Sequence, residues 1–214
     1  MNEKDSGGLR ERKKVATREA LSAAALRLAM ERGPENVRVD DIAEAAGVSP
    51  RTYNNYFSSR EQAIVAAVAA ERALRISAAL RARPEDEPLA EAVVEAVIAQ
   101  YTGDDEPGGD ALMLITSAPG LRTEFVRTVA SIEQPLASAI SARIGGEGGE
   151  GGNDLAAKVL AAAVSAAARV ALAHWLRPGE SGSDLLVVPR GSLADVLREA
   201  LAHVAPALRA ADPR

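Results

Sequence analysis

The stretch Val39-Asp-Asp-Ile-Ala-Glu-Ala-Ala-Gly-Val-Ser-Pro-Arg-Thr-Tyr-Asn-Asn-Tyr-Phe-Ser-Ser-Arg60 predicts two short helices joined by a tight turn. Gly47 provides the positive φ angle that a sharp turn between helices requires. Ser49 and Pro50 are a typical N-cap and first residue of the helix that follows. Proteins use this arrangement to place a helix in the major groove of DNA, although the spacing alone also fits an ordinary αα-hairpin in a bundle.

The second helix of this pair is expected to expose four polar side chains. They are Arg51, Thr52, Asn54 and Asn55. An arginine can donate two hydrogen bonds to guanine and an asparagine can bond to adenine, each contact giving about 1–3 kcal/mol of discrimination. A threonine can bond to a phosphate or pack its methyl group against thymine. The residues expected to close a small core between the two helices are Ile42, Ala46, Val48 and Tyr53.

A cluster of positive charge precedes this motif. Its basic residues are Arg10, Arg12, Lys13, Lys14 and Arg18, with Glu11 the one acidic residue among positions 9–18. The whole chain has a net charge of −5. A local basic segment on an otherwise acidic protein is typical of a module that touches DNA at one end. For this segment taken alone, a solvated, disordered tail is the alternative.

The composition indicates a helical protein without disulfides. Alanine dominates the apolar residues, aromatic residues make up 3%, and cysteine is absent. Alanine-rich segments that are poor in β-branched residues favour helix over sheet. We therefore expect an all-α protein that is cytoplasmic and not associated with a membrane, since the charged N-terminus lacks the apolar core of a signal peptide.

Hydrophobic periodicity and capping residues place helices along the whole chain. The expected helices span residues 17–32, a segment beginning at 40, then 50–56, about 60–83, 89–101, 110–117, 121–144, 154–176 and 193–208. Pro135 is expected to bend the segment 121–144. The residues up to about Leu9 are expected to be disordered, and Gly145–Gly152 is expected to be a flexible linker.

Residues 17–66 resemble the DNA-binding domain of the TetR family of transcriptional regulators. Three segments carry the resemblance: Ala-Leu-Arg-Leu-Ala-Met-Glu-Arg-Gly at the end of the first helix, Val-Asp-Asp-Ile-Ala-Glu-Ala-Ala-Gly-Val-Ser, and Thr-Tyr-Asn-Asn-Tyr-Phe-Ser-Ser-Arg-Glu. The resemblance implies an all-helical homodimer in which an N-terminal three-helix DNA-binding domain precedes a larger helical domain that binds a small effector. The chain departs from the family at Val39, where a threonine is common, and at Asn54 and Asn55, where an aromatic residue and a histidine are common.

The resemblance also implies roles for residues around the motif. The family places phosphate contacts near Tyr56 and Arg60, and the hydroxyl of Ser49 can add another. The alternative for Tyr56 is core packing with only its hydroxyl outward. We expect a basic flexible arm over residues 1–16, a helix-turn-helix domain over 17–62, and an effector-binding and dimerisation domain over 63–214.

Dimerisation is expected because one helix-turn-helix reads few base pairs, whereas two copies read a roughly palindromic operator. The last two helices are the expected dimer surface, and the alternative is that they form internal core. The scarce large residues Tyr101, Met113, Phe125 and Trp175 are candidates for an effector pocket, and each could instead be plain core. The low aromatic content suggests an apolar or amphipathic effector.

No feature predicts an enzyme, a cofactor or a metal site. His174 and His203 lie on different expected helices without a carboxylate at metal-ligand spacing. The chain has no glycine-rich phosphate loop after a strand and no nucleophile elbow. We therefore expect a TetR-like repressor that an effector releases from DNA. The alternatives are a TetR-like activator and a helical ligand-binding or scaffold protein without DNA binding.

Overall fold

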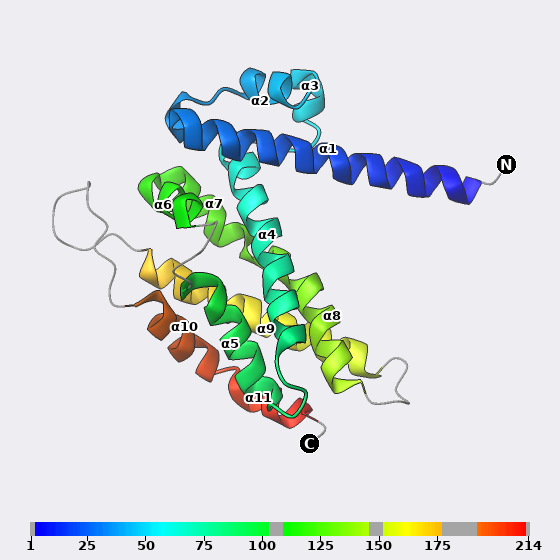
Figure 1. The fold of residues 1–214 in the computed structure, drawn as a ribbon, viewed down its shortest axis with the longest axis vertical. Coiled ribbons are helices and arrows are strands. Elements are labelled where there is room, and N and C mark those ends of the chain that lie inside the picture. Colours follow the sequence, from blue (N-terminus) through cyan, green and yellow to red (C-terminus); the bar gives the residue numbers. More distant parts are fainter. Residues whose placement is uncertain (1–2, 103–108, 146–151, 177–191, 213–214) are drawn as a thin grey trace. The chain divides into compact units, whose positions relative to one another are not determined.

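The computed structural model describes residues 3–102, 109–145, 152–176 and 192–212, and these ranges contain helices and turns but no strand. The helices are α1 (Glu3–Arg32), η1 (Pro34–Asn36), α2 (Val39–Ala45), α3 (Pro50–Tyr53), α4 (Arg60–Ala82), α5 (Leu89–Thr102), α6 (Gly109–Ser117), α7 (Pro119–Thr128), η2 (Val129–Ile132), α8 (Glu133–Ile144), α9 (Gly152–Trp175), α10 (Leu193–Ala202) and α11 (Ala205–Ala211). Figure 1 shows their order along the chain. The predicted all-α class is confirmed.

The chain divides into two compact units. The first comprises Met1–Val68 with Pro107–Phe125, and the second comprises Ala69–Glu106 with Val126–Arg214. The helix α4 therefore begins in the first unit and ends in the second, and α7 crosses the same division near its C-terminal end.

The core of the first unit forms around the middle of α1. Leu21 and Leu28 of α1 are 0% and 2% exposed, and they repeat at the spacing of one helix face. Ile42 of α2 is equally buried, as are Tyr53 and Phe57 at the end of the helix-turn-helix. Helix α1 packs against α2, η1 and α6. We call residues 17–68 the head.

The helix α1 is longer than the sequence predicts. The predicted start near Thr17 is wrong: α1 begins at Glu3, and the segment expected to be disordered and flexible is helical from there onward. Thr17 does not cap the helix, because its Oγ1 donates a 2.9 Å hydrogen bond back to the carbonyl of Lys13. Positions 9–14 hold leucine, arginine, glutamate and lysine, which are good helix formers. A helix that is already packed over residues 17–32 extends through such residues without a new nucleation step.

Other boundaries also differ from prediction, and one of the differences is that the expected helix 193–208 is divided into α10 and α11. Helix α3 ends at Tyr53 rather than near Tyr56. The expected single helix 121–144 is divided into α7, η2 and α8. A proline lacks the N–H donor, and its ring clashes with the carbonyl four residues earlier. A regular helix therefore cannot continue unchanged through the residues before Pro135, and the 3-10 turn η2 lies there. The expected linker Gly145–Gly152 lies mostly outside the described residues.

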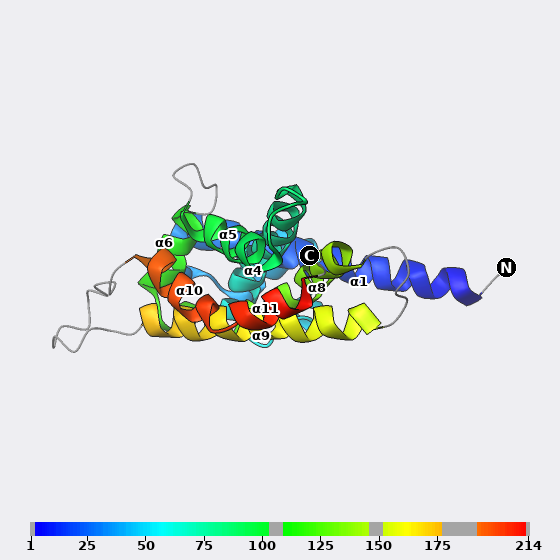
Figure 2. The same cartoon turned by 90° about the horizontal axis from the view of Figure 1, so that it is seen from below.

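The second unit is built around α9. This helix packs against α8 and α10, while α10 and α11 also contact α5. Figure 2 shows α10 and α11 lying along α9. By length and composition, residues 154–175 could cross a membrane, but within this unit they pack as the core helix of a helical bundle does. Only 44% of the apolar window is buried, so much of α9 faces outward.

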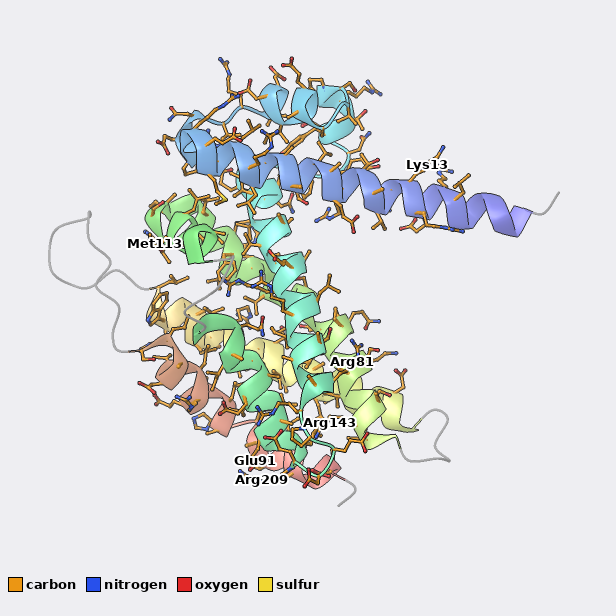
Figure 3. All side chains as sticks on the ribbon, viewed as in Figure 1. Lys13, Arg81, Glu91, Met113, Arg143 and Arg209 are labelled. Atoms are coloured by element: carbon orange, nitrogen blue, oxygen red, sulfur yellow. The ribbon has the colours of Figure 1, made fainter. Side chains whose placement is uncertain are left out.

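Arg143 of α8 holds the turn between α4 and α5. Its guanidinium donates hydrogen bonds of 2.7–3.2 Å to the carbonyls of Leu80, Arg83, Pro84 and Glu87 (Figure 3). The last carbonyls of a helix have no partner inside it. Arg143 therefore caps the C-terminal end of α4 and fixes the path of the chain into α5.

The C-terminal helix is tethered to the start of α5. The carboxylate of Asp212 accepts a 2.6 Å hydrogen bond from the N–H of Leu89. Arg209 of α11 lies 3.1 Å from the carboxylate of Glu91, and Figure 3 shows the two side chains meeting. These contacts join segments that are more than 100 residues apart in sequence.

Candidate nucleic-acid interface

The turn between α2 and α3 has the geometry that its sequence predicts. Gly47 has a φ of 68°, in the left-handed region that favours glycine. The N–H of Gly47 donates to the carbonyl of Glu44 at 3.0 Å, and the N–H of Val48 donates to that of Ala43 at 2.9 Å. These bonds satisfy the last carbonyls of α2 and redirect the chain into α3.

The start of α3 is capped as expected. The Oγ of Ser49 accepts a 3.1 Å hydrogen bond from the N–H of Thr52 and lies 2.9 Å from the Thr52 hydroxyl. Pro50 occupies the first helical position, where its missing N–H costs nothing. Ser49 remains exposed at the N-terminal end of the helix. Exposed N–H groups and a hydroxyl at this position favour a phosphate.

Most of the polar side chains of the motif that are predicted to contact DNA lie at the surface of the head. Arg51, Asn54 and Asn55 are exposed, and Thr52 is half-buried. Asn54 is the C-cap of α3 and Asn55 follows it. The N–H of Tyr56 donates to the carbonyl of Tyr53 at 2.8 Å, so the chain turns tightly here instead of continuing as helix.

Tyr53 anchors the end of α3 to the start of α4. Its ring is fully buried, 5.8 Å from the ring of Phe57, and its hydroxyl donates a 2.8 Å hydrogen bond to the carbonyl of Ser59. Burial, together with the negative charge of Glu61, raises the pKa of Tyr53 to about 12. The hydroxyl therefore stays protonated at neutral pH and acts as a structural donor. This agrees with the prediction that Tyr53 is core.

Arg60 is held within the head by three contacts. One guanidinium nitrogen donates to the carbonyls of Glu35 and Val37 at 2.9 and 3.1 Å. The Nε donates to the Glu61 carboxylate at 2.8 Å. Partial burial acts to raise the pKa of Glu61, but the hydrogen bond and charge of Arg60 outweigh it and hold that pKa below its ordinary value. Arg60 therefore fixes α4 to the segment before α2.

Arg18 connects α1 to the end of the motif. Its guanidinium donates a 3.0 Å hydrogen bond to the carbonyl of Tyr56 and lies 4.5 Å from the centre of the Phe57 ring, a cation–π distance. The sequence predicts that Arg18 contacts DNA, and it does not reveal these contacts with Tyr56 and Phe57. The other basic side chains of the predicted cluster are exposed; they are Arg10, Arg12, Lys13 and Lys14.

The predicted pocket residues lie in different environments. Met113 is 68% exposed on α6, whereas Phe125 of α7 is 2% exposed and belongs to the core of the first unit. Trp175 is half-buried in the second unit. The side chain of Tyr101 lies outside the described residues.

A groove of about 600 Å³ lies between α9 and α10. Alanine and valine line most of it, with His174, Glu199 and His203 as its polar members. Val170 of α9 lines the groove, and beyond the groove α9 exposes Leu155 and Val159; these three side chains are 58–69% exposed. We call the groove and this exposed stripe the α9–α10 face. The sequence identified α9 as apolar on nearly every side but did not show which side is uncovered.

The groove does not form a metal site. No group of three or more histidine, aspartate or glutamate side chains that could hold a metal ion occurs in the described ranges. His174 and His203 line the groove without belonging to such a group.

The fold and the exposed motif define a helix-turn-helix protein. The family profile described as bacterial regulatory proteins, tetR family, matches residues 21–68, and a profile described as the MftR C-terminal domain matches residues 87–209. The chain is 32% identical over 203 residues to the HTH-type transcriptional regulator TcmR of Streptomyces glaucescens, covering 91% of this chain and 88% of that protein. The chain belongs to the TetR family of DNA-binding transcriptional regulators, for which repression and homodimerisation are the norm.

Two further likenesses are weaker. The HTH-type transcriptional regulator BetI of Rhizobium meliloti is 32% identical over 126 residues, which cover 51% of this chain and 62% of that protein. A crystal structure of the TetR-family repressor FadR of Thermus thermophilus, in complex with lauroyl-CoA, is 18% identical with a TM-score of 0.46, covering 87% of this chain and 92% of that chain. The family resemblance expected from residues 17–66 is confirmed.

Proposed function

We propose that the protein is a cytoplasmic repressor that binds a roughly palindromic operator as a homodimer and leaves it when a small apolar or amphipathic molecule binds. The observation that carries this proposal is the exposed polar surface of α3, displayed by a turn and a cap with the geometry of a helix-turn-helix. A helix presented in this way fits the major groove.

The side chains of this surface have distinct roles. Arg51 reads guanine, and Asn54 or Asn55 reads adenine, because these side chains can make two hydrogen bonds to one base edge. Thr52, Ser49 and the hydroxyl of Tyr56 contact phosphates. Arg60 contributes indirectly, because its bonds to Glu35 and Val37 already engage its guanidinium. Arg10, Lys13 and Lys14 of α1 add electrostatic attraction to the DNA backbone.

A second copy of the chain covers the α9–α10 face. Leu155, Val159 and Val170 recur along one side of α9, a span of about 22 Å at 1.5 Å per residue. Large apolar side chains exposed over such a length mark an interaction site. Two copies related by a two-fold axis would pair α9 and α10 with their mates in a four-helix bundle, with small alanines allowing close approach.

Release from DNA acts through α4. This helix starts in the first unit, which contains the helix-turn-helix motif, and ends in the second unit. An effector that shifts α4 changes the position of the head, provided that it binds the released state more tightly than the DNA-bound state. Buried valine, leucine and isoleucine dominate the second unit, which suits an apolar ligand.

The test is binding to duplexes enriched by the wild-type protein from a random-sequence pool. We expect Arg51→Ala combined with Asn55→Ala to reduce the ratio of specific to nonspecific affinity by about 100-fold or more, since each base contact gives about 1–3 kcal/mol. Nonspecific binding should remain. Arg81→Ala, an exposed arginine on the second-unit part of α4, is the matched control.

Two results would count against the proposal. If no sequence is enriched at low salt, the protein is not an operator-binding regulator. If the double variant keeps the full specificity ratio while Arg81→Ala behaves in the same way, α3 is not the reading helix.

A further inference from the structure

The N-terminal extension of α1, residues 3–16, continues the helix beyond the head. Figure 1 shows this part of α1 running past α2 and α3. The extension carries four exposed basic residues: Arg10, Arg12, Lys13 and Lys14. In a helix each residue projects from a fixed side of the axis, which is not true of a disordered tail. The side on which each basic residue lies can therefore be determined.

The basic residues of the extension are concentrated on one side. Arg10, Lys14 and Arg18 are spaced four residues apart, and residues at this spacing lie on one face of a helix. The last of them bonds to the carbonyl of Tyr56, directly after α3. The face that contains Arg10 and Lys14 is therefore the face that meets the end of the recognition motif. Figure 3 shows Lys13 on the side of α1 where α2 and α3 lie.

Arg12 is the exception. At 100° per residue it lies about half a turn from Arg10 and Lys14. Its Nε donates a 3.3 Å hydrogen bond to the carbonyl of Gly8, and the exposed Leu9 and Val15 lie toward the same side of the helix. Glu11 lies beside the basic face, where its carboxylate is 4.0 Å from the Lys14 ammonium. The chain thus contains basic residues on opposite sides of one helix, Arg10 and Lys14 on one side and Arg12 on the other.

We propose that the extension is a second DNA-binding surface, which lies along the phosphates next to the major-groove segment read by α3. This inference rests on the proposed function. The major groove is about 8.5 Å deep. When a reading helix enters it, the protein segments next to that helix come close to the phosphates that border the groove. From Arg10 to Arg18 the helix rises about 12 Å, the length of three to four phosphates on one strand at about 3.4 Å each. The contacts add affinity without reading bases.

The experiment compares Arg10→Ala/Lys14→Ala with Arg12→Ala in the full-length protein. The probe is the duplex that the wild-type protein enriches from a random pool, and binding is measured by fluorescence anisotropy at several salt concentrations. We expect the double variant to lose at least about tenfold in affinity at low salt. A dimer that loses four phosphate contacts should show a log–log salt slope shallower by about 3 to 4. Arg12→Ala should bind as the wild type does.

A hydroxyl-radical footprint and the specificity ratio complete the test. The double variant should lose protection over about three to four phosphates at the edge of each half-site, while its preference for the enriched sequence is retained. Equal weakening by both variants, or an unchanged footprint, would overturn the assignment of this surface. Loss of sequence preference in the double variant would place the two residues in base reading instead. If the wild type enriches no duplex, the proposed function itself fails.

Discussion

The head and the α9–α10 face are both built from alanine-rich helices, but they differ in how much of their apolar surface one chain covers. In the head, Leu21 and Ile42 are 0% exposed. On α9, Leu155 and Val170 are 69% and 58% exposed. The segments of the first unit therefore cover these residues of the head, whereas the apolar stripe of α9 is left uncovered within one chain. In the proposed function, the contacts that display the reading helix and the contacts that join a second copy are therefore made by different parts of the chain.

The largest expected effect comes from breaking the uncovered face. Val170→Asp places a carboxylate in the apolar stripe of α9, at a position that also lines the groove. Burying such a charge in a dimer interface costs several kcal/mol, and about 3 kcal/mol corresponds to more than a 100-fold loss of dimer affinity. Sedimentation equilibrium should show monomers at concentrations where the wild type is dimeric, and operator binding should fall with dimerisation.

Leu74→Asp is the control for this prediction. Leu74 lies on α4 and is 67% exposed, so the same charge is added at an equally exposed apolar position outside the α9–α10 face. It should leave the dimer intact. Dimers that survive Val170→Asp but are lost with Leu74→Asp would show that the two-fold contact lies elsewhere.

The second expected effect is a loss of folding stability, which depends on contacts within one chain and not on contacts between copies. Arg143→Met keeps most of the aliphatic length but removes the donors that hold four carbonyls of the α4–α5 turn. Hydrogen bonds to a charged group contribute about 1.5–3 kcal/mol each and are not additive, so we expect a loss of about 3 kcal/mol in the free energy of unfolding. Urea unfolding measures it.

The control for Arg143 is an arginine in an exposed ion pair. Arg198 lies 3.3 Å from Asp195 on α10, and both side chains are at least half exposed. Such pairs contribute about 0–1 kcal/mol. If Arg198→Met destabilises the protein as much as Arg143→Met does, the hydrogen bonds of Arg143 to the α4–α5 turn do not stabilise the fold more than an exposed ion pair does.

The third expected effect is a dependence of folding stability on alkaline pH, caused by the buried Tyr53 in the core of the head. The pKa of Tyr53 is raised from its ordinary value of 10.0 to about 12, so the folded protein favours the protonated phenol. The stability that depends on this protonation is present below pH 10 and is lost as the pH rises through about 12. A difference of two in pKa corresponds to about 3 kcal/mol. Tyr53→Phe should reduce this alkaline loss, and unfolding measured between pH 8 and 12 checks it.

At neutral pH the same variant should behave differently. Phenylalanine keeps the buried ring but removes the hydrogen bond to the Ser59 carbonyl, which contributes about 1 kcal/mol. Tyr53→Phe should therefore be slightly less stable than the wild type at pH 7 and lose less stability toward pH 12. Parallel pH profiles for the two proteins would contradict the role given to this hydroxyl.

Much of the head could be predicted because its determinants are local. Gly47, Ser49 and Pro50 act on residues no more than four positions away, and their positive φ, cap and first-turn roles are all observed. The exposure of Arg51, Asn54 and Asn55 follows from the same short motif. The roles of these side chains on DNA stay predictions.

The remainder depends on contacts that sequence spacing does not reveal. Arg143 meets a turn about 60 residues earlier, and Asp212 caps a helix that begins 123 residues before it. The uncovered side of α9 could not be found by periodicity, because alanine, valine and leucine occupy 16 of the 19 positions from Leu155 to Ala173. The start of α1 was missed because a basic segment without an apolar face reads equally well as a tail or as a helix.

The smallest expected effect concerns the turn that displays α3. Gly47→Ala adds a methyl group where no other atom lies within 4 Å, so the cost comes from the backbone alone. A residue with a Cβ at a φ of 68° pays about 1–2 kcal/mol, which should appear as a lower free energy of unfolding in urea. Gly8→Ala is the matched control, because Gly8 lies within α1 without a positive φ and also has room for a methyl group. There alanine should be neutral or stabilise the helix by up to about 1 kcal/mol. If Gly47→Ala is also neutral, the positive φ is not what sets the angle between α2 and α3. The display of the reading helix would then depend on the buried contacts of Ile42 and Tyr53 instead of on the turn.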